Sequence, residues 1–261
     1  MDVRLDGRTA LITGASLGLG RAMATEFASS GAAVALLSRT RSTLDEAVAA
    51  IGEVAPEVDV KGYSCDVRSL EKIQAAHAQV VTDLGPVDIL VNNAGTSSAK
   101  PFEEITEEDW QNDFDLKLMA AVRLARACIP AMKTQGWGRI INVLNTAAKA
   151  PPAKSAPTSV SRAAGMALTK ALAGELAPHG ILVNALNTGV LLTNQWHRMH
   201  EEQAPDKSFE DFVATRASRV PLGRLGDASE FANLACFLAS DHGSYITGTA
   251  INVDGGLSPV V

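Results

Sequence analysis

The chain has 261 residues, 46% of them hydrophobic and 20% charged, an ordinary globular composition that argues against a disordered protein. Its net charge of −6 and scattered basic residues give no surface for binding nucleic acid or an anionic membrane. Three cysteines without a CxxC pair, no visible secretory signal and no apolar run of roughly 18 residues predict a cytoplasmic protein with buried free thiols.

Short apolar runs alternate with segments of helical spacing along the whole chain. The predicted strands cover residues 9–13, 33–37, 60–64, 87–91, 139–144, 181–186 and 250–253. The predicted helices cover residues 21–29, 42–53, 70–83, 110–132, 159–177 and 229–238. This alternation requires right-handed crossovers, so residues 1–261 are expected to form one Rossmann-type α/β domain, a doubly wound, mostly parallel sheet of about seven strands with helices on both faces.

One segment, at about 190–225, interrupts the alternation. It carries Trp196, His197, His200 and Phe212 and follows the end of a predicted strand. Ligands of open α/β sheets bind outside the carboxyl ends of the strands. We therefore expect this insertion to act as a substrate lid over a small apolar ligand.

The first predicted strand runs directly into a glycine-rich turn that precedes a helix. Glycines allow a tight turn and a close approach of backbone N–H groups to a pyrophosphate, and the helix N-terminus attracts the anion. A turn between a strand and a helix is the context that this motif needs. A dinucleotide is therefore the expected ligand, bound by Gly14, Ser16, Leu17, Gly18, Leu19 and Gly20.

The end of the second predicted strand favours NADP over NAD. An NAD site usually places an acidic residue there, whereas this chain has Ser38-Arg39-Thr40. Arg39 is well placed to meet a 2′-phosphate. The alternative for Arg39 is a solvated residue at a helix start, and NAD stays as the alternative cofactor.

Motifs along nearly the whole chain resemble those of the short-chain dehydrogenase/reductase family. They are TGxxxGxG at 13–20, CDV at 65–67, NNAG at 92–95, Trp110, GRIIN at 138–142, RVPLGRLG at 219–226 and the ending VDGG at 253–256. The resemblance implies that Asp66 and Val67 contact adenine and that Asn93, Ala94 and Gly95 line the ribose. It also implies backbone contacts to the nicotinamide from Thr188 and Gly189, a further cofactor contact from Leu191, and a homotetramer formed through helices 110–132 and 159–177.

The resemblance also implies a Ser, a Tyr-x-x-x-Lys pair and a helical Asn in the active site. At the matching positions this chain has Asn145, Thr158, Arg162 and Lys117. The only tyrosines, Tyr63 and Tyr245, lie on the third strand and before the last one, so neither can replace the missing phenol. An aliphatic hydroxyl is far too weak an acid to take over from a phenol with a pKa of about 10.

Several of these side chains keep useful chemistry. Arg162 can hydrogen-bond a ribose, Asn145 can donate to a carbonyl, and Lys117 can act as an acid or base if burial lowers its pKa. A solvated lysine on a helix face is the alternative for Lys117. His197 and His200, three residues apart in the lid, supply an alternative general acid, but too few ligands for a metal site, so no metal is expected.

Two functions are compatible with family-like cofactor motifs combined with altered catalytic positions. The first is an NADP-dependent oxidoreductase for a small carbonyl, alcohol or enoyl substrate, in which the proton comes from Lys117, a lid histidine or water. The second is a catalytically inactive member that serves as an NADP(H) sensor or scaffold subunit.

Overall fold

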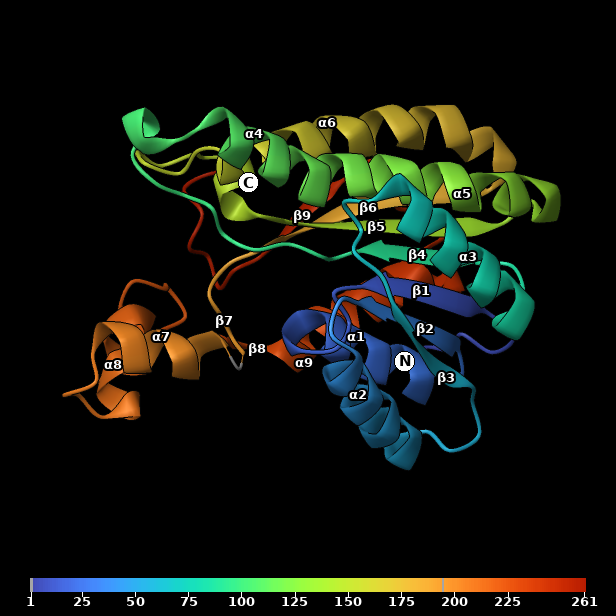
Figure 1. Cartoon of the computed structure of the whole chain (residues 1–261), viewed down its shortest axis with the longest axis horizontal. Coiled ribbons are helices and arrows are strands. Elements are labelled where there is room, and N and C mark those ends of the chain that lie inside the picture. Colours follow the sequence, from blue (N-terminus) through green and yellow to red (C-terminus); the bar gives the residue numbers. More distant parts are fainter. Residues whose placement is uncertain (1, 194) are drawn as a thin grey trace.

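A computed structural model, which describes residues 2–193 and 195–261, has a seven-stranded parallel sheet at its centre (Figure 1). Its order is β3-β2-β1-β4-β5-β6-β9, so the chain winds outward from β1 in one direction and from β4 in the other. The fold predicted from the alternating pattern is confirmed. The strands are β1 (Thr9–Thr13), β2 (Ala33–Ser38), β3 (Val60–Ser64), β4 (Ile89–Asn92), β5 (Gly138–Asn145), β6 (Ile181–Thr188) and β9 (Ala250–Val253).

Helices cover both faces of this sheet (Figure 1). On one face lie α1 (Gly18–Ser29), α2 (Arg41–Val54) and α9 (Ala228–Ala239), and on the other lie α3 (Leu70–Leu84), α5 (Ala120–Gln135) and α6 (Thr158–Leu176). Short 3-10 turns, η1 (Phe102–Glu104), η3 (Thr146–Ala148), η4 (Ala177–His179) and η5 (Asp241–Gly243), complete the connections. The crevice expected of such a fold lies at the carboxyl ends of β1 and β4, where the winding reverses.

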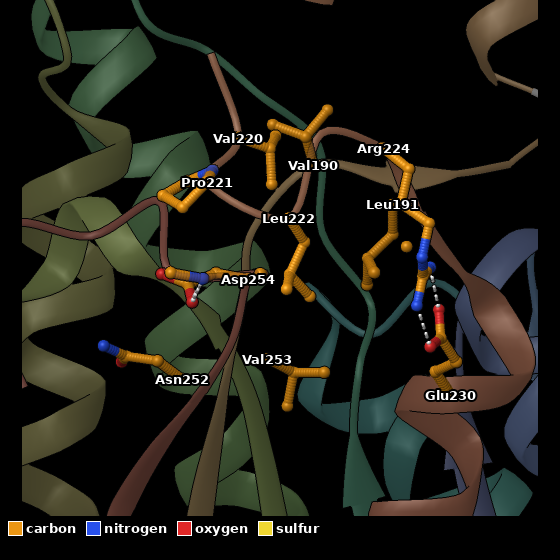
Figure 2. A pocket seen from close by; sticks show the side chains of 13 residues that line it. Val190, Leu191, Val220, Pro221, Leu222, Arg224, Glu230, Asn252, Val253 and Asp254 are labelled. Carbon is orange, nitrogen blue, oxygen red and sulfur yellow. Dashed lines mark hydrogen bonds and ion pairs between the residues drawn. The ribbon is translucent and has the colours of Figure 1, made fainter. Parts of the chain in front are cut away.

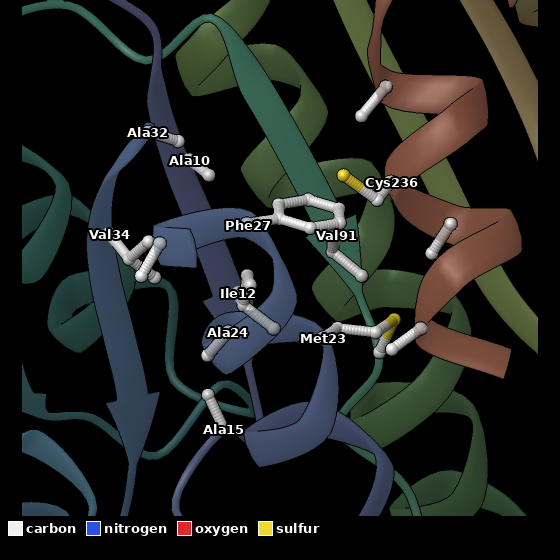
Figure 3. Packing of buried hydrophobic residues seen from close by; sticks show 14 of the residues in the cluster. Ala10, Ile12, Ala15, Met23, Ala24, Phe27, Ala32, Val34, Val91 and Cys236 are labelled. Carbon is white, nitrogen blue, oxygen red and sulfur yellow. The ribbon is translucent and has the colours of Figure 1, made fainter. Parts of the chain in front are cut away.

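The core on the α1 face shows why the glycine-rich turn is held firmly (Figure 3). All residues of β1 are buried, and Phe27 and Met23 of α1 pack between Ile12 of β1 and Cys236 of α9. Burying a side chain as large as that of Phe27 contributes about 1.5–3 kcal/mol. The turn between β1 and α1 is therefore anchored at both ends.

The helix predicted over 110–132 is interrupted. It begins earlier, as α4 (Glu107–Phe114), where Thr106 and Asp109 form a capping box. A π-helical segment, η2 (Asp115–Met119), then separates α4 from α5. Such π-helical insertions are rare and often lie at functional sites, and this one carries Lys117.

The described residues of the segment 190–225 form a separate helical hairpin beside the carboxyl ends of the strands (Figure 1). The short strand β7 (Leu191–Leu192) pairs with β8 (Gly226–Asp227), and between them lie α7 (Gln195–Gln203) and α8 (Phe209–Ala217). Whether this hairpin closes over a substrate stays a prediction. Among the described residues, no helix is long and apolar enough to cross a membrane.

The apolar lid pocket expected from Trp196 and Phe212 stays a prediction. The two rings pack on each other at 6.1 Å, and the guanidinium of Arg216 lies 3.6 Å from the centre of the Phe212 ring. The His200 ring also stacks edge-on against Phe212, 5.2 Å away. Because these rings form a small core within the lid, they are not evidence for an apolar substrate.

Candidate active site

The turn between β1 and α1 has the geometry of an anion cradle. Gly14 and Gly18 have positive φ angles of 63° and 56°, which favour glycine. A side chain on Gly20 would collide with the carbonyl oxygen of Gly14, so only glycine fits there. Within the described part of the chain no side chain caps α1, and its first turn has no acidic residue, so its N–H groups are open to a phosphate.

The NNAG motif supports this turn from the neighbouring strand. The Thr13 hydroxyl accepts hydrogen bonds from the backbone N–H groups of Asn93 and Ala94, each at 2.9 Å. The Asn93 side chain donates to the carbonyl oxygens of Thr13 at 2.9 Å and Gly14 at 3.2 Å. Asn93 therefore holds the turn in shape, whereas its predicted contact with the ribose stays a prediction.

Polar groups gather beyond β2 and β3, where the sequence predicts the adenosine end of the cofactor. Arg39 is exposed, and none of the ion pairs among the described residues involves it. Ser16 and Ser38 share a 3.0 Å hydrogen bond. Arg68 binds the Asp66 carboxylate and lowers its pKa to about 2. An exposed guanidinium directly after β2 fits a 2′-phosphate.

Lys117 lies in a buried polar cluster with Asp113 and Thr158. Its ammonium group contacts the Asp113 carboxylate and donates a 3.1 Å hydrogen bond to the Thr158 hydroxyl. That hydroxyl also accepts from the Ser98 N–H at 2.9 Å, and Ser161 donates to the other oxygen of Asp113 at 2.5 Å. The side chains of Lys117 and Asp113 are 1% and 0% exposed, so water does not compete for these bonds.

This burial decides between the two interpretations of Lys117. The side chain is not solvated, so the alternative of a lysine on an exposed helix face is wrong. Burial lowers the pKa of Lys117 below its ordinary value of 10.5, the Asp113 carboxylate opposes that shift, and the positive charge of Arg162 adds to it. The amine thus has the lowered pKa expected of an acid–base group.

Arg162 turns toward the sheet, where its guanidinium donates a 2.5 Å hydrogen bond to the carbonyl oxygen of Val143. It fits there because Gly95 has no side chain: a Cβ atom on Gly95 would collide with it. Burial lowers the pKa of Arg162 to about 10, which leaves it charged at neutral pH. Arg162 Nε and Asn145 Oδ1 are buried without a partner among the described residues, so a bound ligand or water would have to satisfy them.

The segment after β6 returns across the glycine-rich turn. Thr188 donates to the Leu144 carbonyl at 3.2 Å, and the Gly189 N–H donates to the Val253 carbonyl at 3.0 Å. Thr193, which belongs to no family motif, comes within 3.8 Å of the position that a Cβ atom on Gly18 would take. This segment therefore lies next to the turn that is predicted to bind the pyrophosphate.

Leu191, predicted to contact the cofactor, points into a cavity of about 540 Å³ (Figure 2). Apolar side chains such as Val190 and Leu222 line it, and an ion pair between Arg224 and Glu230 crosses its edge. Neither Lys117 nor Thr158 lines this cavity. It is distinct from the polar cluster around Lys117.

Residues 14–258 match the family model described as enoyl-(acyl carrier protein) reductase. The chain is also 38% identical over 260 residues to the oxidoreductase UcpA of Salmonella typhimurium, covering 97% of this chain and 95% of that protein. The chain belongs to the short-chain dehydrogenase/reductase family. The family resemblance carried by the sequence motifs is thereby confirmed.

Solved structures of this family superpose closely on the chain. L-sorbose reductase from Gluconobacter frateurii, complexed with NADPH and L-sorbose, is 36% identical with a TM-score of 0.96, and the match covers 100% of both chains. A short-chain oxidoreductase from Pseudomonas aeruginosa PAO1, NADPH-bound and described as containing an atypical catalytic center, is 33% identical with a TM-score of 0.92 over 99% of both chains. The predicted NADP cofactor agrees with the NADPH bound in these relatives.

The family motifs did not indicate every residue of the site. Asp113, Ser161 and Ser98 complete the cluster around Lys117, yet the only signal for any of them in the sequence is the four-residue spacing of Asp113 and Lys117. The side chain of His197, an alternative proton donor, lies outside the described part of the chain. Within the described part, no cluster of acidic, histidine or cysteine side chains could hold a metal.

Proposed function

We propose that the protein is an NADP-dependent oxidoreductase that interconverts a small carbonyl compound and its alcohol, with Lys117 as the source of the proton. The observation that carries this proposal is the buried contact between the Lys117 ammonium and the Thr158 hydroxyl, 3.1 Å apart. Thr158 occupies the position at which the family resemblance implies a tyrosine. The Thr158 hydroxyl therefore stands where a tyrosine-dependent member has its phenol, and Lys117 is hydrogen-bonded to it.

NADPH, when bound, supplies the hydride. The glycine-rich turn and the uncapped start of α1 would hold its pyrophosphate, and Arg39 would hold its 2′-phosphate. Asn145, whose amide oxygen lacks a partner among the described residues, would orient the substrate oxygen by donating through its Nδ2 group.

Thr158 is the proposed relay between Lys117 and the substrate. The Thr158 oxygen accepts hydrogen bonds from Lys117 and from the Ser98 N–H. These two bonds use both lone pairs of the oxygen, so the hydroxyl proton is left to donate. The Asp113 carboxylate can accept this proton, but at 3.4 Å from the Thr158 oxygen it makes only a weak hydrogen bond. In the proposed step, the hydroxyl gives this proton to the substrate oxygen and takes one from Lys117 Nζ, which becomes a neutral amine.

An inactive NADP(H) sensor or scaffold is the alternative, and the relatives do not support it. They are named as oxidoreductases and reductases rather than as regulatory subunits. Reduction of the carbon–carbon double bond of an enoyl substrate is the second candidate reaction, because the matching family model is described as an enoyl reductase.

The test compares the wild type with Lys117→Met and with the control Lys133→Met, an exposed lysine on α5. After NADPH binding is measured by fluorescence, small ketones, aldehydes, ketoses and enoyl thioesters are screened for NADPH oxidation. Lys117→Met should lower kcat by about 10²–10⁴-fold, the usual contribution of a general acid, while the Kd for NADPH stays within about twofold. Full activity in Lys117→Met would overturn the proton route.

The reaction should also depend on pH in a defined direction. The charged ammonium is the proton-donating form, so reduction persists below the pKa of Lys117 and is lost as the pH rises through it. Because that pKa lies below 10.5, the alkaline limb of the kcat profile should lie below pH 10.5. The profile from about pH 6 to 10.5 measures it, and a rate that is flat over this range would contradict the assignment.

A further inference from the structure

Asp113 is a buried carboxylate that neither the sequence motifs nor the proposed proton relay uses. Asp113 lies on α4, one helical turn before Lys117, and the residue as a whole, backbone included, is 2% exposed. A carboxylate cut off from water is strongly unfavourable unless charged or hydrogen-bonding partners surround it. The partners that it has therefore indicate what it does.

These partners are all polar groups of the proton site. One carboxylate oxygen contacts the Lys117 ammonium and lies 3.4 Å from the Thr158 hydroxyl, and the other accepts the 2.5 Å bond from Ser161. Ser161 and Thr158 both belong to the first turn of α6, so the carboxylate ties α4 to α6 at this point. Asp113 holds the ammonium between two fixed elements.

The contact between Asp113 and Lys117 opposes the other influences on the charge of the amine. Asp113 from α4 and Arg162 from α6 act on its amine, while Arg123 from α5 is paired with Asp115, 2.9 Å away. Burial and the positive charge of Arg162 both disfavour the ammonium form. The Asp113 carboxylate is the group that opposes both effects.

We propose that Asp113 is a positioning residue of the proton-transfer site, where its carboxylate keeps the Lys117 ammonium charged and directed at the Thr158 hydroxyl. This inference rests on the proposed role of Lys117 as the proton source. Without the carboxylate, the amine would lose its proton at a lower pH and would lose the contact that fixes its position.

The experiment uses Asp113→Asn, which keeps the size of the side chain and removes its charge. The control is Asp115→Asn, which removes a carboxylate two residues away that pairs with Arg123 instead. In Asp113→Asn the alkaline limb of the kcat profile should move down by about one to two pH units, whereas in the control it should stay in place. The KM for substrate and the Kd for NADPH should change by less than about twofold in both variants, because Asp113 contacts neither ligand in the proposed arrangement.

A second readout does not depend on turnover. The full chain, labelled with ¹⁵N-lysine and loaded with NADPH, is titrated by NMR, and the Nζ signal missing from Lys117→Met identifies Lys117. Its titration midpoint should fall in Asp113→Asn and stay in place in Asp115→Asn. An unchanged midpoint in Asp113→Asn would overturn the inference even if Lys117→Met is inactive; an active Lys117→Met variant would instead overturn the proposed proton source.

If Asp113→Asn fails to fold, the wild type still provides a test. A hydrogen bond from the Lys117 ammonium to the Asp113 carboxylate should give a measurable scalar coupling between Nζ and the ¹³C-labelled carboxyl carbon. It should also slow exchange of the ammonium protons with water. Rapid exchange without this coupling would show that the carboxylate does not hold the amine and would refute the proposal.

Discussion

The two halves of the candidate site are built from different parts of the chain. The cofactor half uses backbone N–H groups, glycines and one exposed arginine at the ends of β1 and β2. The proton half uses buried side chains that meet from α4, η2 and α6. A site made of backbone depends on the absence of side chains, whereas a site made of buried charges depends on the pairing of each charge. The two halves should therefore respond differently to substitution.

Among substitutions in the cofactor half, the largest effect is expected from Gly20→Ala. The added methyl group would meet the carbonyl oxygen of Gly14, so the turn has to open and its N–H groups lose their alignment. NADPH affinity should fall by about a hundredfold, or about 2.7 kcal/mol. Fluorescence titration measures it, with Gly52→Ala in α2 as the control because a methyl group there meets nothing within 4 Å. Equal affinities in the two variants would show that the turn does not cradle the cofactor.

Gly95→Ala tests whether the cofactor half and the proton half of the site respond independently to substitution. Gly95 belongs to a cofactor motif, yet its missing side chain makes room for the buried guanidinium of Arg162. We expect a loss of stability of about 1–3 kcal/mol, typical of overpacking, and a drop in kcat of about tenfold. Denaturant unfolding and steady-state kinetics measure these effects. The added change Arg162→Lys should restore part of the stability, since a lysine needs less width; if it restores none, the two residues are not coupled.

The smallest effect is expected from Arg39→Ala, which removes an exposed side chain and leaves the backbone intact. The Kd for NADPH should rise by about tenfold, or 1.4 kcal/mol, while the Kd for NADH changes by less than about twofold. Arg4→Ala, at the opposite end of the sheet, is the control for the loss of one surface charge. If Arg39→Ala weakens both cofactors equally, Arg39 does not contact the 2′-phosphate.

Much of the fold could be predicted because its signals are local. Strand-length apolar runs and intervening helices specified the parallel sheet, and the predicted bounds of β1, β3 and β9 match the structure. The π-helical segment η2 was not predicted, since its residues are ordinary helix formers and the i to i+5 bonding depends on tertiary packing. The helices of the lid were not predicted because the sequence of α7, QWHRMHEEQ, is mostly polar and offers only Trp196 and Met199 as apolar positions.

The parts of the site whose residues are contiguous in the sequence could be predicted, and the parts that folding brings together could not. The glycine-rich turn is contiguous, so its residues stand together in the sequence. Asp113 follows an acidic stretch, Glu107-Glu108-Asp109, and reads as one more solvated acid. Its partner Ser161 lies 48 residues away, and only the packing of α4 on α6 brings the two together. Burial of this kind cannot be inferred from spacing along one helix.

The paired burial of Asp113 and Lys117 sets a rule for redesign and for evolutionary change. Removing one partner of a buried ion pair costs about 3–5 kcal/mol, because the other charge is left stranded in the protein. Placing the family's Asn, Ser, Tyr and Lys at positions 117, 145, 158 and 162 would strand the carboxylate of Asp113. A tyrosine-dependent reductase made from this chain therefore requires a fifth substitution, and any lineage crossing between the two active sites would have to change Asp113 and Lys117 nearly in step.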